Sequence, residues 1–226
     1  MWPPVAGNRA VSELCRLYLI TPPSIESPAA FVEQFKSALD GGDIASIQVR
    51  LKGADGAAAP HDDVLRICEA LTPAARDAGV AIIVNDDPNT AKSADADGVH
   101  IGQSDASYAE ARKILGDDKI IGVTCHNSTH LAMEAGEAGA DYVAFGAFFP
   151  TVTKTAPTTA SLEILSDWAF ATTVPCVAIG GITPDNCGPV IQAGADLIAV
   201  SAGVWRHPDG PRAGVAKFNQ AFAEFS

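Results

Sequence analysis

The chain has 226 residues, enough for one domain to bury a large hydrophobic core without the support of a disulfide or a metal ion. Apolar residues make up 47% of it, as in ordinary globular proteins, and 27 acidic against 15 basic residues give a formal net charge of −12. This charge argues against a surface that binds nucleic acid or anionic membranes, but it leaves room for a small phosphorylated ligand.

Targeting signals and cysteine usage both favour a cytoplasmic protein. The longest apolar runs have the length of strands, well short of the ~20 residues that span a bilayer. The first residues lack the basic and apolar regions of a signal peptide. Five cysteines with no CxxC pair are typical of reduced thiols rather than of disulfides or a zinc site. We therefore expect one domain over 1–226, with a short N-terminal extension over about 1–14, and no membrane or nucleic-acid partner.

Short apolar segments alternate with helical patterns along the whole chain. We predict strands at 16–21, 46–51, 81–86, 98–102, 120–125, 141–146, 175–181 and 197–202, and helical patterns at 27–40, 61–79 and 107–116. Most of the strand segments are continuously apolar, which is typical of strands covered on both faces. Strands that alternate with helices form a parallel sheet.

The fold class that this pattern predicts is α/β, as a closed (β/α)8 TIM barrel. Eight strand–helix units fit into 226 residues, slightly fewer than is usual for such barrels. The alternative is an open, doubly wound sheet. That fold usually has a GxGxxG turn after its first strand, whereas the sequence here reads LYLITPPS.

Three polar residues alternate along the second strand and its exit. Gln48, Arg50 and Lys52 are two residues apart, so their side chains project to the same side. Polar groups that face a barrel interior are costly unless they meet an anion or another partner. We interpret them as anion-binding residues, and the alternative is an outward-facing or ion-paired set.

Carboxylates follow the third and fourth strands. Asn85 and Asp86 end the third strand and are followed by Asp87, and Asp105 follows the fourth strand. Adjacent strand ends that present carboxylates can hold Mg²⁺, which prefers one or two carboxylates together with substrate phosphate oxygens. The alternative for Asp87 and Asp105 is a helix N-cap, since each precedes a helical segment.

Hydroxyl groups and a lysine follow the fifth and sixth strands. Thr124 closes the fifth strand, and Thr151, Thr153 and Lys154 follow the sixth. These groups can all donate hydrogen bonds to phosphate oxygens.

The last two strands end in small residues. Gly180 and Gly181 end the seventh strand, and Val200 and Ser201 end the eighth. Loops after the seventh and eighth strands commonly bind phosphate in barrels. Two small, polar loops, 53–62 and 151–160, also follow strands and are either lids or tolerant surface loops.

Residues for covalent catalysis are not evident. His100 and His126 lie within apolar strands, where a histidine is usually a hydrogen-bonded core residue. No Ser-His-Asp or Cys-His spacing stands out, and nothing in the sequence indicates a lowered pKa for Cys125.

Taken together, these segments resemble the thiamine-phosphate synthase family, also named thiamine-phosphate pyrophosphorylase. The matching segments are LYLIT, QVRLK, VNDDPNTA, DGVHIGQSD, IIGVTCH, GADYVAFGAFFPTVTK, VAIGGIT and AVSAGV, in the family's order over about 17–205. The segments NDD, GQSD and PTVTK are fairly specific, whereas IGGI also occurs in other phosphate-binding barrels.

The resemblance implies a barrel enzyme, a transferase that joins 4-amino-2-methyl-5-hydroxymethylpyrimidine diphosphate to a thiazole ethyl phosphate and releases diphosphate. It assigns to the pyrimidine diphosphate Gln48, Val49, Arg50, Leu51, Lys52, Asn85, Thr124 and Lys154, of which Arg50, Lys52 and Lys154 would be catalytic. It assigns to Mg²⁺ Asp86 and Asp105, and to the thiazole phosphate Thr151, Thr153, Gly181, Val200 and Ser201. The partners implied are small phosphorylated substrates, and the sequence leaves open whether the chain forms a homo-oligomer.

Two departures from the family pattern lie near these residues. Thr124 stands where the family typically has Ser, and Ala147 stands where Pro is frequent. Neither removes a charged ligand.

Two other functions fit the same scaffold. A thiazole tautomerase-like isomerase shares the thiazole-phosphate site but typically lacks the diphosphate-binding residues. A non-catalytic, regulatory phosphate-binding barrel would need no Mg²⁺ site. The carboxylate pair and the polar residues of the second strand favour the synthase over both.

Overall fold

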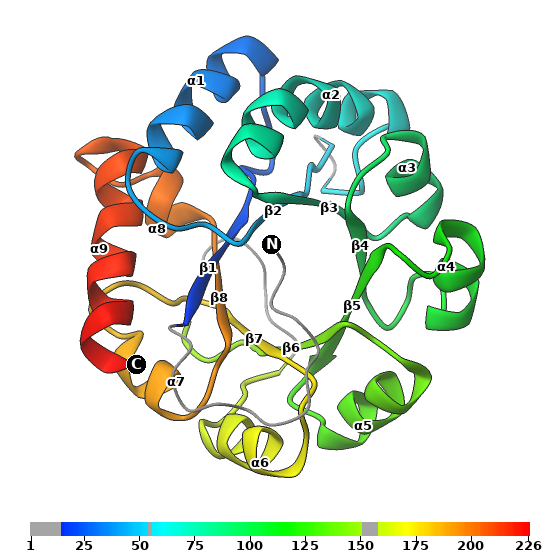
Figure 1. The fold of residues 1–226 in the computed structure, drawn as a ribbon, viewed down its shortest axis with the longest axis vertical. Helices are drawn as coiled ribbons and strands as arrows, with labels where there is room; N and C mark the ends of the chain where they lie inside the picture. Colours follow the sequence, from blue (N-terminus) through cyan, green and yellow to red (C-terminus); the bar gives the residue numbers. More distant parts are fainter. Residues whose placement is uncertain (1–14, 54–55, 151–157) are drawn as a thin grey trace.

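A computed structural model describes residues 15–53, 56–150 and 158–226, and these residues form a closed barrel of eight parallel strands. The strands are β1 (Arg16–Ile20), β2 (Ser46–Val49), β3 (Ala81–Asn85), β4 (Gly98–Ile101), β5 (Ile120–His126), β6 (Tyr142–Gly146), β7 (Cys176–Ile179) and β8 (Leu197–Val200). Each strand pairs with the next, and β1 also pairs with β8, which closes the ring (Figure 1). The predicted TIM barrel is therefore confirmed, and the open sheet is excluded.

Helices surround the ring of strands on the outside (Figure 1). They are α1 (Pro28–Leu39), α2 (His61–Ala78), α3 (Pro88–Ser93), α4 (Tyr108–Leu115), α5 (Thr129–Ala138), α6 (Glu163–Ala171), α7 (Gly188–Gln192), α8 (Ala202–Trp205) and α9 (Gly210–Phe225). The limits of all eight strands lie within two residues of those predicted from the apolar segments. The predicted extension over 1–14 lies outside the described residues.

The hydrophobic core has two layers because side chains alternate between the two faces of each strand. One cluster fills the inside of the barrel and includes Tyr18, Ile20, Tyr142, Ala144, Val177, Leu197 and Ala199. The larger cluster lies between the sheet and the helices and includes Leu17, Leu19, Ile47, Val49, Leu51, Val143 and Val200. Both faces of every strand are therefore covered, which explains the continuous apolar segments.

An aspartate precedes each even-numbered strand and bonds to the odd-numbered strand before it. The bonds are Arg16 Nε to Asp43 Oδ2 at 2.6 Å, Ile82 N to Asp97 Oδ2 at 2.7 Å, Ile121 N to Asp141 Oδ2 at 2.8 Å and Cys176 N to Asp196 Oδ2 at 2.7 Å. These four aspartates therefore link the strands in pairs at the N-terminal end of the barrel. This end contributes stability in TIM barrels, whereas active sites lie at the opposite end.

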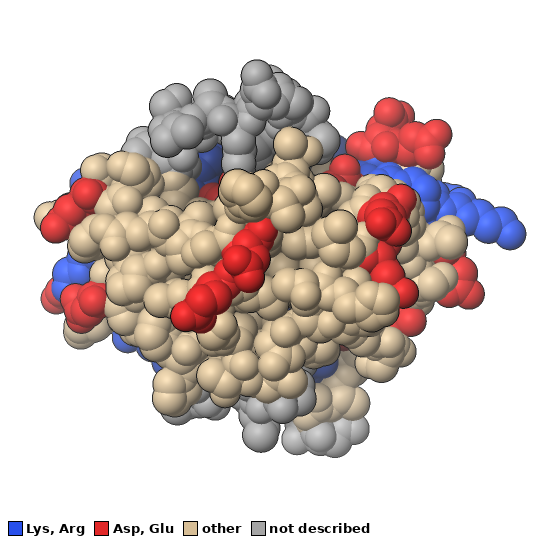
Figure 2. Space-filling view, turned by 90° about the horizontal axis from the view of Figure 1, so that it is seen from below, with Lys and Arg blue, Asp and Glu red and all other residues tan. Residues whose placement is uncertain are grey.

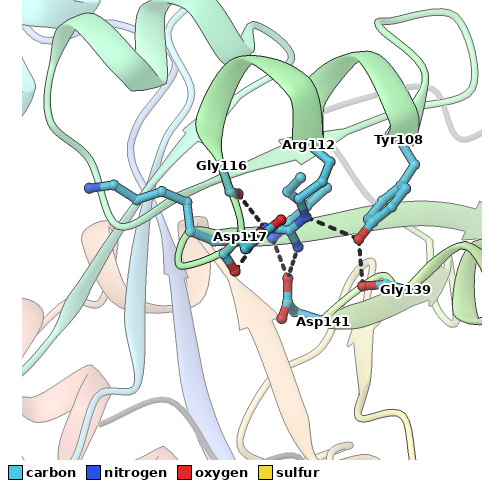
Figure 3. Close-up of polar contacts among 8 residues, drawn as sticks. Tyr108, Arg112, Gly116, Asp117, Gly139 and Asp141 are labelled. Atoms are coloured by element: carbon cyan, nitrogen blue, oxygen red, sulfur yellow. Dashed lines mark hydrogen bonds and ion pairs between the residues drawn. The ribbon is translucent and has the colours of Figure 1, made fainter.

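Arg112 of α4 connects several backbone carbonyls at the same end of the barrel (Figure 3). Its guanidinium donates to the carbonyls of Gly116 and Lys119 at 2.8 and 2.6 Å, and to Asp141 Oδ2 at 2.9 Å. Its Nε donates to the Tyr108 hydroxyl at 3.1 Å. One planar side chain thus fixes the turn from α4 into β5.

Acidic side chains are dispersed over the face of the molecule shown in Figure 2, and basic side chains are fewer there, as the net charge of −12 leads one to expect. Within the described residues, no helix is both long and apolar enough to cross a membrane.

Candidate active site

The C-terminal ends of β2 and β3 bring Gln48 and Asn85 together at the mouth of the barrel. Gln48 faces the interior, is 3% exposed, and its Nε2 donates to Asn85 Oδ1 at 2.8 Å. Gln48 is aligned with Ile83, so Asn85 is the next inward-facing residue along β3 and lies closer to the mouth. The sequence prediction that places Gln48 on the inner side of β2 agrees with this geometry.

Arg50 and Lys52 extend the same alternation beyond the end of β2. The Thr21 hydroxyl accepts from Arg50 N at 3.0 Å and donates to Arg50 O at 3.2 Å, which holds this backbone against the end of β1. Lys52 Nζ lies 3.9 Å from Asp86 Oδ2. Partial burial lowers the pKa of Arg50, and the charge of Asp86 opposes this effect. Two cations therefore adjoin the carboxylate of Asp86, the residue directly after β3.

Asp86 and Asp105 form a pair of carboxylates between the ends of β3 and β4. Partial burial raises the pKa of Asp86, and the charge of Asp105 and a hydrogen bond with it raise this pKa further, against the effect of Lys52 and Arg50. Asp86 N donates to His100 O at 2.8 Å, and Asp105 Oδ2 accepts from Gly102 N at 2.7 Å. Two carboxylates held this close repel each other unless a proton or a cation lies between them.

Of the two aspartates that the sequence offered as helix N-caps, Asp87 is one and Asp105 is not. Asp87 is the N-cap of α3, where its carboxylate accepts from Asn89 N at 2.9 Å and Thr90 N at 3.2 Å. Asp105 is not a cap, because Ser107 begins α4 with a capping box to Glu110. Asp105 is therefore left to face Asp86.

Thr124 lies near the end of β5, with its hydroxyl bonded to His100. Thr124 Oγ1 is 2.7 Å from His100 Nε2. The strand continues one residue beyond the predicted end at 125, through a register shift between Thr124 and His126. His100 is a hydrogen-bonded residue of the barrel interior, as expected from its position in an apolar strand.

The glycines after β7 let the segment after β6 pack closely. A Cβ atom on Gly181, where φ is +64°, would lie 2.4 Å from Pro150 O, and one on Gly180 would lie 2.4 Å from Ala147 Cβ. Both positions therefore require glycine for steric reasons. The backbone of Gly181 stays close to the mouth, and its carbonyl accepts from Asn186 Nδ2 at 3.1 Å.

Ser201 follows β8 and precedes the short helix α8. Its Oγ donates to Thr21 O at 3.2 Å. It borders a cleft of about 180 Å³ lined also by Pro22, Pro23, Gln34, Ala202, Trp205 and Arg206. A short extra helix after β8 is a common part of phosphate sites in TIM barrels.

Not all predicted site residues lie together at the mouth. The side chains of Val49, Leu51 and Val200 pack between the sheet and the helices, so only their backbone groups are available to a ligand. Thr151, Thr153 and Lys154 lie outside the described residues, as does most of the loop 151–160.

Sequence reasoning missed Thr21, Tyr18 and Tyr142. Thr21 fixes the backbone of Arg50, and the hydroxyls of Tyr18 and Tyr142 are 2.9 Å apart inside the barrel. Side chains two residues apart on a strand share a face, so Ser46 faces the interior as Gln48 does. Tyr18 is aligned with Ser46, and Tyr142 is aligned with Gly122, so the register places both tyrosines inside the barrel.

Comparisons with known proteins agree with the fold and identify the family. The thiamine monophosphate synthase family model matches residues 17–204. A thiamine-phosphate synthase from Rhodospirillum centenum is 55% identical over 206 residues, 91% of this chain and 97% of that protein. One from Hyphomonas neptunium is 51% identical over 207 residues, 92% of this chain and 93% of that protein.

A solved structure gives the same result. Thiamine phosphate pyrophosphorylase from Pyrococcus furiosus superposes with a TM-score of 0.78 at 32% identity, over 93% of this chain and 96% of that one. Sequence and structure comparisons thus agree over nearly the whole chain, and the chain belongs to the thiamine monophosphate synthase family.

Proposed function

We propose that this thiamine-phosphate synthase joins 4-amino-2-methyl-5-hydroxymethylpyrimidine diphosphate to a thiazole ethyl phosphate at the C-terminal mouth of its barrel, in a Mg²⁺-dependent reaction. The observation that carries the proposal is the pairing of Asp86 with Asp105 beside Lys52 and Arg50. This arrangement suits a diphosphate, which needs both a metal ion and cations.

The residues present fit a magnesium ion. Asp86 and Asp105 supply two carboxylates whose mutual repulsion a divalent cation would relieve. The described residues contain no group of three or more His, Cys, Asp or Glu side chains placed to hold a metal. A site with two carboxylates accords with the usual coordination of Mg²⁺, which keeps several waters and takes substrate phosphate oxygens as ligands. When bound, the ion would neutralise charge on the diphosphate leaving group.

The chain's own cations would favour departure of the diphosphate. Arg50 and Lys52 reach the mouth from the end of β2, where Thr21 fixes the Arg50 backbone. Fixed positive groups stabilise the negative charge that develops as a leaving group departs, without reorganisation at that moment. We assign the same role to Lys154 on the strength of the family resemblance.

The pyrimidine ring would contact the Gln48–Asn85 pair, whose mutual hydrogen bond fixes both amides. The thiazole phosphate would lie on the opposite side of the mouth, near Gly181 and the cleft at Ser201, with Thr151 and Thr153 as further ligands. Backbone groups of Val49, Leu51 and Val200 border these two regions.

The reaction needs positioning and electrostatics more than proton transfer. The bond between the pyrimidine methylene carbon and the diphosphate oxygen breaks with its electron pair on the diphosphate. The aminopyrimidine delocalises the positive charge, and the thiazole nitrogen lone pair forms the new C–N bond. Binding both substrates side by side would supply much of the rate enhancement.

The test is an assay that follows thiamine phosphate and diphosphate together, with the pyrimidine diphosphate, the thiazole phosphate and Mg²⁺. We expect both products in equal amounts, and neither when EDTA removes the metal. Folded protein that forms no product would contradict the proposal. In that case interconversion of thiazole isomers would indicate a tautomerase, and tight thiazole-phosphate binding without turnover would indicate a regulatory barrel.

We also propose that the protein works in the cytoplasm on small phosphorylated substrates. All five cysteines are buried and none is in a disulfide, as expected for a reducing compartment.

A further inference from the structure

Four polar side chains form a continuous chain of hydrogen bonds across the interior of the barrel. The Tyr18 hydroxyl is 2.9 Å from the Tyr142 hydroxyl, which is 2.9 Å from His100 Nδ1. His100 Nε2 is in turn 2.7 Å from Thr124 Oγ1. The chain crosses from β1 to β6, which are not neighbours in the sheet, and ends near the mouth at Thr124.

The shape of the interior fixes the central ring. A Cβ atom on Gly122 would lie 1.9 Å from Tyr142 Cζ, so only glycine leaves room for the Tyr142 ring against β5. The Tyr142 and His100 rings stack with centroids 5.5 Å apart and planes 22° apart. This packing places the Tyr142 hydroxyl between Tyr18 and His100.

The hydrogen atoms that these side chains carry determine which group donates and which accepts in each of the bonds. Burial raises the pKa of Tyr18 and of Tyr142, so both hydroxyls keep their hydrogens at neutral pH. Within the described residues, Tyr142 is the one hydrogen-bond partner of the Tyr18 hydroxyl, which therefore donates to it. A buried hydroxyl hydrogen without an acceptor is costly. We assign the Tyr142 hydrogen to His100 Nδ1, which lies 2.9 Å from the Tyr142 hydroxyl oxygen.

This order of donors and acceptors determines which group the Thr124 hydroxyl can bond to. A histidine that accepts at Nδ1 carries its hydrogen on Nε2, and Nε2–H donates to Thr124 Oγ1. The Thr124 hydroxyl must then donate its own hydrogen elsewhere. In the opposite direction it would donate to His100 and present only lone pairs to a ligand at the mouth, which would repel an anion.

We propose that Tyr142 and His100 are positioning residues that make the Thr124 hydroxyl a hydrogen-bond donor toward the diphosphate of the substrate. This inference rests on the proposed function for the identity of the anion. Tyr18 fills the barrel and bonds to Tyr142, but it does not set the direction, because the Tyr142 hydrogen still has His100 Nδ1 as acceptor without it.

The matched variants are Tyr142→Phe and Tyr18→Phe, since each removes one buried hydroxyl and keeps the ring. Nitrogen-15 NMR of protein labelled at histidine reads the tautomer without substrate. We expect the Nε2–H tautomer for His100 in the parent and in Tyr18→Phe, and its loss or mixture with Nδ1–H in Tyr142→Phe. A parent His100 in the Nδ1–H form would overturn the proposal, whatever the behaviour of the variants.

Binding and kinetics test the action on Thr124. Calorimetry with inorganic diphosphate and Mg²⁺ is expected to show about tenfold weaker binding for Tyr142→Phe and for Thr124→Val, and no further weakening when the two are combined. Turnover by Tyr142→Phe is expected to fall mainly in kcat, and Tyr18→Phe is expected to stay within about twofold of the parent.

Equal losses in Tyr142→Phe and Tyr18→Phe would indicate a purely structural role and contradict the proposal. Failure of the synthase assay itself would instead remove the proposed function. The NMR and calorimetric results would still decide the direction of the chain and its effect on anion binding.

Discussion

Asp86 adopts a backbone conformation that residues other than glycine rarely hold, with φ at +68°. Its carboxylate is also directed toward Asp105, and burial and that neighbour raise its pKa. An acid whose pKa is raised by folding destabilises the fold when it is ionised, at pH values above its unfolded pKa. Strain and repulsion at one residue are typical of functional positions, where activity is favoured over stability.

Ser46 is a buried residue of β2 whose Oγ has no hydrogen-bond partner among the described residues. We predict that Ser46→Ala raises the free energy of unfolding by about 1 kcal/mol, because it removes a buried hydroxyl that gains no bond. Urea unfolding measures this change. Tyr18→Phe is the control, since it removes a buried hydroxyl that has a partner and is expected to lower stability by about 1 kcal/mol. A lower free energy of unfolding in Ser46→Ala would contradict the interpretation that the Ser46 hydroxyl gains no hydrogen bond.

Sequence reasoning reached the site residues that follow strand ends but not the interior chain. Gln48, Asp86 and Asp105 were identified because parallel strands present their C-terminal residues at one edge. Tyr18 and Tyr142 are 124 positions apart and meet only because the barrel closes. No local pattern encodes that contact, since it depends on Gly122 leaving space on a third strand.

At the scale of elements, caps and turns decide where the helices begin and how they connect to the strands. The sequence predicted the three helices for which it gave limits to within one residue at each end. It could not decide between a cap and a ligand for Asp87 and Asp105. For Asp105 the choice depended on whether Asp105 or the nearby Ser107 is the N-cap of α4.

The capping box of α4 predicts that the stability of the fold depends on pH, and one substitution tests this dependence. Ser107 Oγ and Ser107 N donate to Glu110 Oε2 at 2.7 and 2.9 Å, and these bonds hold the pKa of Glu110 below its usual value. A depressed pKa stabilises the fold above the unfolded value, about 4.3, and this contribution disappears as the pH falls through the folded pKa.

Glu110→Gln keeps a capping box that does not titrate. We therefore predict that the difference in Tm, parent minus Glu110→Gln, is constant near neutral pH and decreases as the pH drops below about 4. Thermal unfolding followed by circular dichroism at pH 7 and at pH 3.5 measures the difference. A difference in Tm that does not change with pH would contradict the role of the carboxylate.

Arg112 stabilises the turn after α4 through the planar geometry of its guanidinium. We predict that Arg112→Lys lowers the free energy of unfolding by about 2 kcal/mol, because an ammonium group cannot reproduce bonds to several carbonyls and to Asp141 at once. Chemical denaturation measures the loss, and Lys113→Ala on the exposed side of the same helix is the control, expected within about 0.5 kcal/mol of the parent. A small change in Arg112→Lys, equal to that control, would contradict this prediction.

At the scale of the whole molecule, stability and chemistry occupy opposite ends of the barrel. Asp97, Asp141 and Asp196 each bind a backbone N–H of the preceding strand at the N-terminal end. Asp86 and Asp105 face each other at the C-terminal end. The eight apolar strand segments and the helical patterns between them made the barrel predictable from the sequence, because both are local signals repeated along the chain.

This division predicts how variants at the two ends differ. Asp141→Ala is expected to lower the free energy of unfolding by about 2 kcal/mol, because it leaves a buried N–H and a guanidinium without their partner. It is expected to leave kcat/KM unchanged at a temperature where the protein stays folded. A loss of kcat/KM equal to that of a mouth variant would contradict the separation of the two ends.

The most direct single measurement is kcat/KM for thiamine phosphate formation by Asp86→Asn, compared with the parent in the same Mg²⁺ buffer. We predict a loss of about 100-fold or more, because a charged ligand of the proposed metal site is removed. Tm without Mg²⁺ should equal or exceed that of the parent, because a repelled carboxylate is also removed. Activity close to that of the parent, in protein of unchanged Tm, would show that the carboxylate pair does not carry the reaction.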